Sequence, residues 1–181
     1  MVSRTRRVGG ALPWLLGALV PMSGCLFDGR LAPDGSGQFT LHYTVGRDAT
    51  EFLERQRFSS PYVQVTRMKI QEDLRAEVEG QVTDVTRLAT AEGFRDINIV
   101  RTLDGGAGEL AIWIRHPPSN PPRSSTLPGP QISLAVPGRV HQANRHAEIG
   151  ENHVTWRFSL SEWLREPVID LHVHWEDPNH T

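Results

Sequence analysis

The chain of 181 residues contains a single cysteine, Cys25, and a single lysine, Lys69. One cysteine excludes an intramolecular disulfide, so packing must stabilise the folded body. The net charge is −2, and this mildly acidic balance argues against binding to nucleic acid or, by charge alone, to anionic lipid. Beyond the N-terminal region, no run is long and apolar enough to span a membrane.

The N-terminus has the pattern of an export signal. Three arginines precede an apolar run over residues 8–22, which is too short to cross a bilayer. The small residues Ser23 and Gly24 then lead to Cys25. A basic segment, an apolar segment and a small-residue cleavage site are the three parts of a secretory signal. We therefore expect residues 1–24 to be a cleaved lipoprotein signal peptide.

Residues 22–25, Met-Ser-Gly-Cys, resemble the lipobox of bacterial lipoproteins. The resemblance implies that Cys25 is acylated and becomes the first residue of the mature chain, with residues 25–36 as the lipidated cysteine and its tether. Two or more acyl chains on one cysteine give stable anchoring. The expected location is the bacterial cell envelope, and Leu26 after the cysteine favours the outer membrane in a Gram-negative host. The alternative is an ordinary signal peptide that contains a cysteine.

Residues 37–181 alternate short strand patterns with short helical ones. Apolar residues recur at every second position in 39–45 and 74–82, and residues 63–70 are strand-like with a less regular alternation. A glycine-rich turn at 104–108 joins two further strands as a hairpin. Helices are expected over 49–58, 84–92 and from 159, with Asp48, Asp84 and Ser159 as their N-terminal caps. The pattern predicts an α+β fold, a largely antiparallel sheet with two or three short helices packed on it, in one compact domain.

Residues 117–130 contain six prolines. This composition predicts a solvated, extended loop, or alternatively a boundary between two subdomains. Strand patterns resume at 132–136, 139–143, 154–160 and 168–175.

Two stretches together resemble a known family. Residues 23–26 leading into 33–41, and residues 132–140 leading into 152–156, are similar to bacterial lipoproteins of the mycobacterial LppM type. The resemblance covers about a third of the chain. It implies a membrane-tethered α+β domain, likened to lipid-binding folds, with no established catalysis.

The last strand carries a candidate metal-binding group. Asp170, His172 and His174 are two residues apart, so their side chains share one face of the strand. Carboxylate and imidazole groups are plausible zinc ligands, and His42 could join them from a neighbouring strand. The simpler interpretation is the outward row of an amphipathic strand, because His-x-His without a third ligand at a diagnostic spacing is weak. We therefore assign no metal and no cofactor.

Trp113 is the candidate for a binding contact. Ile112 and Ile114 have the opposite parity along the strand, so Trp113 is expected on the other face, beside Arg115. If no helix covers that face, Trp113 and Arg115 can contact a ligand or partner. Otherwise Trp113 belongs to the core.

The chain has no recognisable catalytic motif: the nucleophile elbow, His-Glu-x-x-His, the phosphate-binding loop, the dinucleotide fingerprint and the EF-hand are all missing. We expect a non-enzymatic envelope lipoprotein that binds a lipid, a glycolipid or an envelope protein. Acyl chains would need a cleft lined by residues such as Phe39, Leu41 and Trp156. The first alternative is a surface metal-binding or hydrolytic protein that uses Asp170, His172 and His174, and the second is a purely structural assembly lipoprotein.

Overall fold

The structure is a computed structural model that describes residues 25–116 and 127–176. Strands dominate this part of the chain and form two sheets, with a few short helices. The predicted signal peptide at 1–24 and most of the proline-rich segment lie outside the described residues.

The larger sheet has seven strands. Every neighbouring pair is antiparallel except β1 and β7, which run parallel. In spatial order its strands are β3 (Val63–Ile70), β4 (Arg75–Val82), β2 (Gly37–Thr44), β1 (Leu26–Leu31), β7 (Pro128–Ala135), β10 (His153–Ser159) and β9 (Glu148–Ile149).

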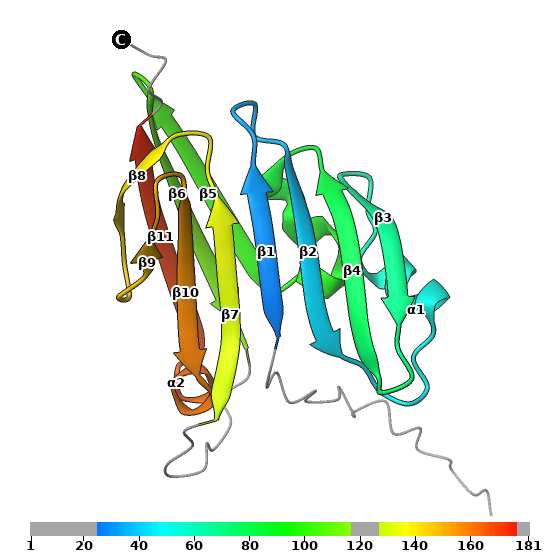
Figure 1. Cartoon of the computed structure of the whole chain (residues 1–181). Helices are drawn as coiled ribbons and strands as arrows, with labels where there is room; N and C mark the ends of the chain where they lie inside the picture. The colour runs from blue at the N-terminus through cyan, green and yellow to red at the C-terminus, as the bar shows by residue number, and fades with distance from the viewer. Residues whose placement is uncertain (1–24, 117–126, 177–181) are drawn as a thin grey trace, which may run out of the picture.

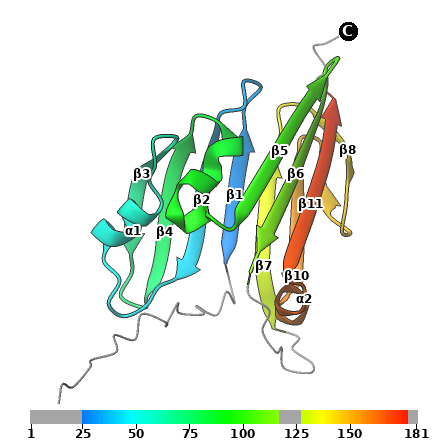
Figure 2. The same ribbon diagram turned by 180° about the vertical axis from the view of Figure 1, so that it is seen from behind.

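The smaller sheet has four antiparallel strands and packs behind one half of the larger sheet, across β1, β7 and β10 (Figures 1 and 2). Its strands, in spatial order, are β5 (Ile97–Asp104), β6 (Ala107–Arg115), β11 (Val168–Glu176) and β8 (Arg139–Ala143). The mixed α and β content agrees with the sequence, but the expectation of a single sheet is wrong, because the second half of the chain supplies another layer.

Short helices cover the other half of the larger sheet. Helix α1 (Glu51–Arg57) and the 3₁₀ helices η1 (Val85–Thr90) and η2 (Glu92–Phe94) lie behind β2, β4 and β3, while α2 (Leu160–Arg165) follows β10 at the lower end (Figure 2). The opposite face of the seven-stranded sheet carries no helix or strand of the described residues (Figure 1).

Residues Leu26–Leu31 form β1, in the middle of the larger sheet, where a tether was expected. Phe27 and Leu31 turn inward and Asp28 and Arg30 turn outward, which is ordinary strand alternation. The tether prediction is wrong because six residues with this alternation bury apolar surface once β2 and β7 lie on either side. The strand-rich body therefore begins directly after Cys25.

The helix ends differ in part from the expectations. The capping box of Ser159 and Glu162 at α2 is confirmed. Thr50, not Asp48, caps α1 by accepting a hydrogen bond from the Leu53 amide. Asp84 caps as expected, by accepting from the Thr86 amide, but the segment it begins is 3₁₀-helical.

Two further boundaries need correction. Gly93 does not end a helix in the left-handed conformation; it lies within η2, where an added Cβ would strike the ring of Phe58. Residues 128–130, expected in the proline-rich loop, belong to β7. The turn between β5 and β6 is confirmed, with Gly105 and Gly106 both at positive φ.

The buried side chains form two clusters. The first lies between the two sheets and contains Trp156 and Trp175, each 1% exposed. The second lies between the larger sheet and the short helices, around Phe39 and Phe58. Four partly buried residues contact both clusters and join them: Phe27, Val85, Ile97 and Ile99.

The cleft expected around Phe39, Leu41 and Trp156 is filled by side chains. Phe39 is buried beside the rings of Phe27 and Phe94. Trp156 belongs to the other cluster, and its indole N–H donates to the carbonyl of Asn144. The three residues do not line a common cleft of the kind that acyl chains would need, because they lie in two separate clusters. No helix of the described residues is long and apolar enough to cross a membrane.

Candidate binding surfaces

Five residues that the sequence offered in two separate groups lie on one surface, the outer face of the four-stranded sheet. Trp113 and Arg115 come from β6, and Asp170, His172 and His174 come from β11. The antiparallel register places Trp113 directly opposite Asp170. No helix or strand of the described residues covers this face (Figure 2), so the condition set for Trp113 as a contact residue is met.

Trp113 is half-buried between polar neighbours. Asn98 of β5 and Asp170 of β11 flank it in the sheet. The ring meets His172 edge-on, with ring centroids 5.9 Å apart and an interplanar angle of 87°. An aromatic side chain held in a fixed orientation and partly exposed is typical of the centre of a protein contact.

Arg145, which follows β8, fixes the carboxylate of Asp170. Its Nη2 donates to Asp170 Oδ1 at 2.5 Å and to Glu166 Oε2 at 2.7 Å, and its Nε donates to the Asp170 carbonyl at 2.7 Å. The Arg145 guanidinium lowers the pKa of the Asp170 carboxyl. No sequence pattern points to Arg145, because only the packing of the turn after β8 against β11 brings it to this position.

Both histidines on this face lie near the carboxylate of Glu109. His172 Nδ1 and His174 Nε2 are 3.7 and 3.9 Å from Glu109 Oε1. Residues 25–116 and 127–176 contain no group of three His, Cys, Asp or Glu side chains arranged to hold a metal ion. His42 cannot join the group, because β2 belongs to the other sheet and places His42 between Leu26 and Glu77. The expectation that it lies on a neighbouring strand is wrong.

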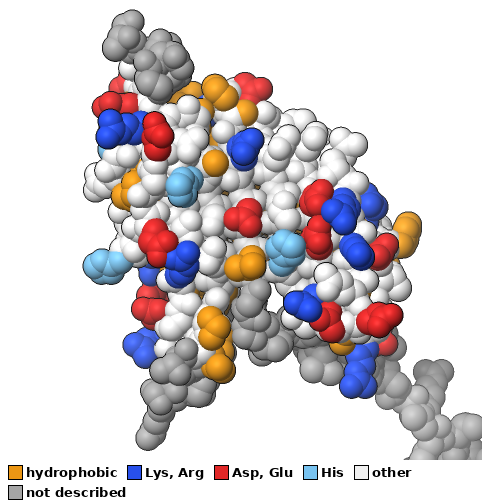
Figure 3. All heavy atoms as spheres, viewed as in Figure 1, with side chains coloured by type: hydrophobic (Ala, Val, Ile, Leu, Met, Phe, Trp, Pro, Cys, Tyr) orange, Lys and Arg blue, Asp and Glu red, His pale blue; other side chains and the backbone are white. Residues whose placement is uncertain are grey.

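The uncovered face of the seven-stranded sheet is hollowed. Two adjoining depressions, with volumes of about 420 and 480 Å³, share the residues Arg30, Gln38 and Gln81. Figure 3 shows a broad area with few charged or apolar side chains over the upper parts of β2, β4 and β3. This area is a shallow groove that crosses several strands and has both polar and apolar lining.

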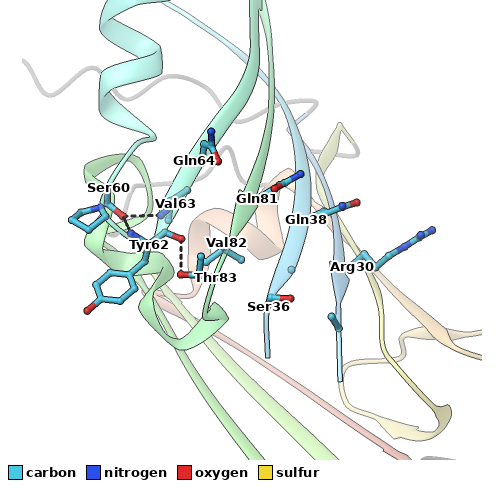
Figure 4. A pocket seen from close by; sticks show the side chains of 13 residues that line it. Arg30, Ser36, Gln38, Ser60, Tyr62, Val63, Gln64, Gln81, Val82 and Thr83 are labelled. Atoms are coloured by element: carbon cyan, nitrogen blue, oxygen red, sulfur yellow. Dashed lines mark hydrogen bonds between the residues drawn. The ribbon is translucent and has the colours of Figure 1, made fainter. Parts of the chain in front are cut away.

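A row of four exposed side chains crosses this groove. Gln64 of β3 lies opposite Gln81 of β4, Gln81 opposite Gln38 of β2, and Gln38 opposite Arg30 of β1. Figure 4 shows the four residues along adjacent strands. We call them the amide row. The strand pattern in the sequence shows that these residues point outward but not that they are neighbours, so the amide row was not predicted.

The amide row differs from other polar groups on the same face. Arg67 pairs with Glu77 and Glu79, at 3.3 and 3.0 Å. Farther along the sheet, Arg157 donates to Gln131 and pairs with Glu148. None of the four side chains of the amide row has a hydrogen bond or ion pair with another described residue, so their polar groups are free to bind a ligand.

Cys25 lies at the lower end of β1. Its carbonyl accepts a hydrogen bond from the Gln131 amide at 2.9 Å. The side chain is 9% exposed, and burial raises the pKa of its thiol to about 11. The folded structure thus protects the unmodified thiol from reaction, since the thiolate is the reactive form.

Comparisons with known proteins identify no relative. No protein-family model matches the chain, and neither the curated proteins nor the solved structures give a significant match.

Proposed function

We propose that this protein is a bacterial envelope lipoprotein, anchored through acylated Cys25, that binds an envelope protein without catalysing a reaction. The observation that carries the proposal is the lipobox-like segment 22–25, followed at once by the first strand of the body. The resemblance to LppM-type lipoproteins points the same way and stays a prediction.

The position of Cys25 has a consequence for the order of events. Because β1 starts at the next residue, acyl chains on Cys25 would hold the sheet directly at the bilayer surface, without a flexible spacer. Because the thiol is buried in the folded chain, acylation must precede the pairing of β1 with β7. Modification of the unfolded, newly exported chain meets this requirement.

The outer face of the four-stranded sheet supports a protein partner better than an acyl chain. Trp113 supplies an aromatic anchor, and exposed Arg115 and the Arg145–Asp170 pair surround it with polar groups. An aromatic centre with a polar rim is the usual composition of a protein interface. The apolar side chains that an acyl chain would need, such as Phe39 and Trp156, are packed in the two clusters.

The anchor is tested by mass spectrometry and cell fractionation in a bacterial host that acylates lipoproteins. We expect the mature wild-type protein to begin at Cys25, to carry an added acylated glyceryl group and to sediment with membranes. The Cys25→Ala variant should be soluble, whereas the control Ser36→Ala should remain with the membranes. An unmodified thiol, or membrane association of Cys25→Ala equal to wild type, would refute the anchor.

The Trp113 surface is tested by crosslinking in intact cells. A photoreactive amino acid at position 113 should give one discrete adduct with an envelope protein, which mass spectrometry can identify. The same probe at position 133, on the outer face of the other sheet, is the matched control. The Trp113→Ala variant should also lose co-purification of that protein. Equal crosslinking from both positions, or unchanged co-purification, would contradict the assignment.

A further inference from the structure

We propose that the amide row binds an uncharged glycan chain laid across β3, β4, β2 and β1. This assignment goes beyond the proposed function, because it concerns a different surface from that of Trp113 and does not require acylation of Cys25.

The chemistry of the row matches sugar hydroxyls. A glutamine amide both donates and accepts hydrogen bonds, as a hydroxyl does, and Arg30 adds further donors at one end of the row. The strands are spaced by about 4.8 Å, so the row repeats its polar groups at short, regular intervals. A ligand with hydroxyl groups at regular intervals can satisfy all four side chains at once.

The lining of the groove also suits sugar rings. Pro61 is exposed at the β3 end of the groove and adds apolar surface there, whereas the ring of Tyr62 points away from the amide row and lies under the guanidinium of Arg87 (Figure 4). Ser36, Ser60 and Thr83 line the same depression, but their hydroxyls are already hydrogen-bonded to Asp34, to Thr90 and to the Tyr62 carbonyl, so the amide row supplies the free polar groups. A sugar ring has polar edges and apolar C–H faces, and therefore needs both kinds of lining.

Charge and polarity argue against other ligands. Among the described residues, Arg30 is the one cation that lines either depression, and Asp28 and Glu79 line the second one, so a polyanion such as nucleic acid lacks the cations it requires. An acyl chain on the amide row would remove water from three amides without replacing their hydrogen bonds, which costs free energy.

A peptide strand has little access to the nearest sheet edge. Peptides commonly add to a sheet by pairing with its outermost strand. Here Arg55 of α1 donates to the Val65 carbonyl, Glu51 accepts from the Ile70 amide, and the Val63 backbone pairs with Ser60, so several backbone groups of β3 are already engaged. A glycan that lies across the strands needs no free edge.

The test is a titration of the full-length protein in micelles of a detergent without a sugar headgroup. The probes are chitotetraose and cellotetraose, followed by calorimetry and by the glutamine side-chain NH₂ signals in NMR spectra. We expect one of the two tetrasaccharides to shift the Gln38, Gln64 and Gln81 signals. Gln38→Ala and Gln81→Ala should each weaken binding by about three- to tenfold, the loss expected for one or two hydrogen bonds.

Gln131→Ala is the matched control. Gln131 is a glutamine on the same sheet face whose amide is already engaged by Arg157 and Ser133. This variant and Trp113→Ala should bind the sugar as wild type does, which separates the glycan site from the proposed partner surface. Unchanged unfolding midpoints show that the variants are folded.

Several results would overturn the proposal. It fails if neither tetrasaccharide binds, or if Gln131→Ala weakens binding as much as Gln38→Ala does. It also fails if heparin binds the groove and the neutral sugars do not, since Arg30 would then act alone. The groove would belong to a protein partner if an unstructured decapeptide shifted the glutamine NH₂ signals and neither sugar did.

Discussion

The two halves of the seven-stranded sheet are covered in different ways. Behind β1, β7 and β10 lies a second sheet, and the layer between them holds the tryptophans Trp156, Trp163 and Trp175. Behind β2, β4 and β3 lie only short helices, and the buried rings there are phenylalanines. The type of buried aromatic residue thus follows the type of cover.

Packing geometry explains the difference. Two stacked sheets lie about 10 Å apart, so large indole rings help to fill the layer between them. Under the short helices, Phe94 meets Phe39 and Phe58 edge-on, with ring centroids 5.2 and 5.0 Å apart. Small rings at these angles fill the irregular space beneath one- and two-turn helices.

The largest effect is expected from removing one ring in each half. Trp156→Ala should lower the free energy of unfolding by about 3–5 kcal/mol, because it leaves a cavity and removes the hydrogen bond to Asn144. Phe58→Ala should cost about 3 kcal/mol. Urea unfolding followed by tryptophan fluorescence and circular dichroism measures both changes.

The same experiment tests whether the two halves unfold together. Because Phe27 and Ile99 contact both clusters, we expect one transition in each variant, coincident by both probes. A transition that splits in two in either variant would show that the halves are separate folding units. Trp156→Phe, which keeps most of the ring volume, should lower the free energy of unfolding markedly less than Trp156→Ala does.

A smaller effect is expected where a glycine lies beneath an aromatic ring. A Cβ at Gly108 would strike the ring of Trp175 between the sheets, and a Cβ at Gly80 would strike Phe39 under the helices. Gly108→Ala and Gly80→Ala should each cost about 1–3 kcal/mol of unfolding free energy by overpacking. Gly46→Ala, which meets nothing within 4 Å, is the control and should be near neutral. If the Gly108 and Gly80 variants are as stable as this control, then Trp175 and Phe39 do not pack tightly against these glycines.

Removing the helix caps should have a smaller effect again. At α2, Ser159 accepts from the Glu162 amide and Glu162 accepts from the Ser159 amide, whereas at α1 Thr50 makes one capping bond of 3.3 Å. We expect Ser159→Ala to cost about 1 kcal/mol and Thr50→Ala about 0.5 kcal/mol, measured as shifts in the urea midpoint. A larger loss at Thr50 would reverse this ranking of the two helices.

The smallest effect is expected in the pH dependence of stability, from two carboxylates that pair with arginines. Arg145 lowers the pKa of Asp170 beside the second sheet, and Arg75 lowers that of Asp73 in the turn before β4. A carboxyl whose pKa is lowered by folding stabilises the folded state at pH values above its pKa in the unfolded chain, which is about 3.9. This contribution is lost as the pH falls through the pKa of the folded state. Asp170→Asn should therefore lower the unfolding midpoint at pH 7 and have no effect near pH 2.

Asp73→Asn is the counterpart in the helix-covered half. Arg75 is 71% exposed and Arg145 only 25%, so the change at Asp73 should be the weaker of the two. Thermal unfolding at both pH values measures each difference. If Asp170→Asn still has a lower unfolding midpoint than wild type at pH 2, then hydrogen-bond geometry, rather than charge, is responsible for the loss.

Local patterns in the sequence predicted much of the strand content. The alternation in residues 168–175 identified β11 and its inward face, and Leu171, Val173 and Trp175 are almost fully buried. The spacing of Ser159 and Glu162 identified the start of α2. Each of these features depends on residues a few positions apart, whose geometry the backbone fixes directly.

Prediction from the sequence failed where segments far apart in the chain come into contact. A tether was predicted at β1 because nothing near it in the sequence shows that β7, about a hundred residues later, is its parallel partner. The amide row was missed for the same reason, since Gln38, Gln64 and Gln81 become neighbours only through strand pairing. For the Trp113 surface, the sequence supplied the residues but not their common location.

Local alternation in the amino-acid sequence is enough to show which face of its strand a side chain occupies, because alternation is a property of the extended backbone. Tertiary structure decided which strands are neighbours, and therefore which outward residues share a surface. Pairing is decided by the burial of apolar side chains from segments far apart in the chain, and a period of two is the same for every choice of partner. The free amide row and the exposed Trp113 are both products of that choice.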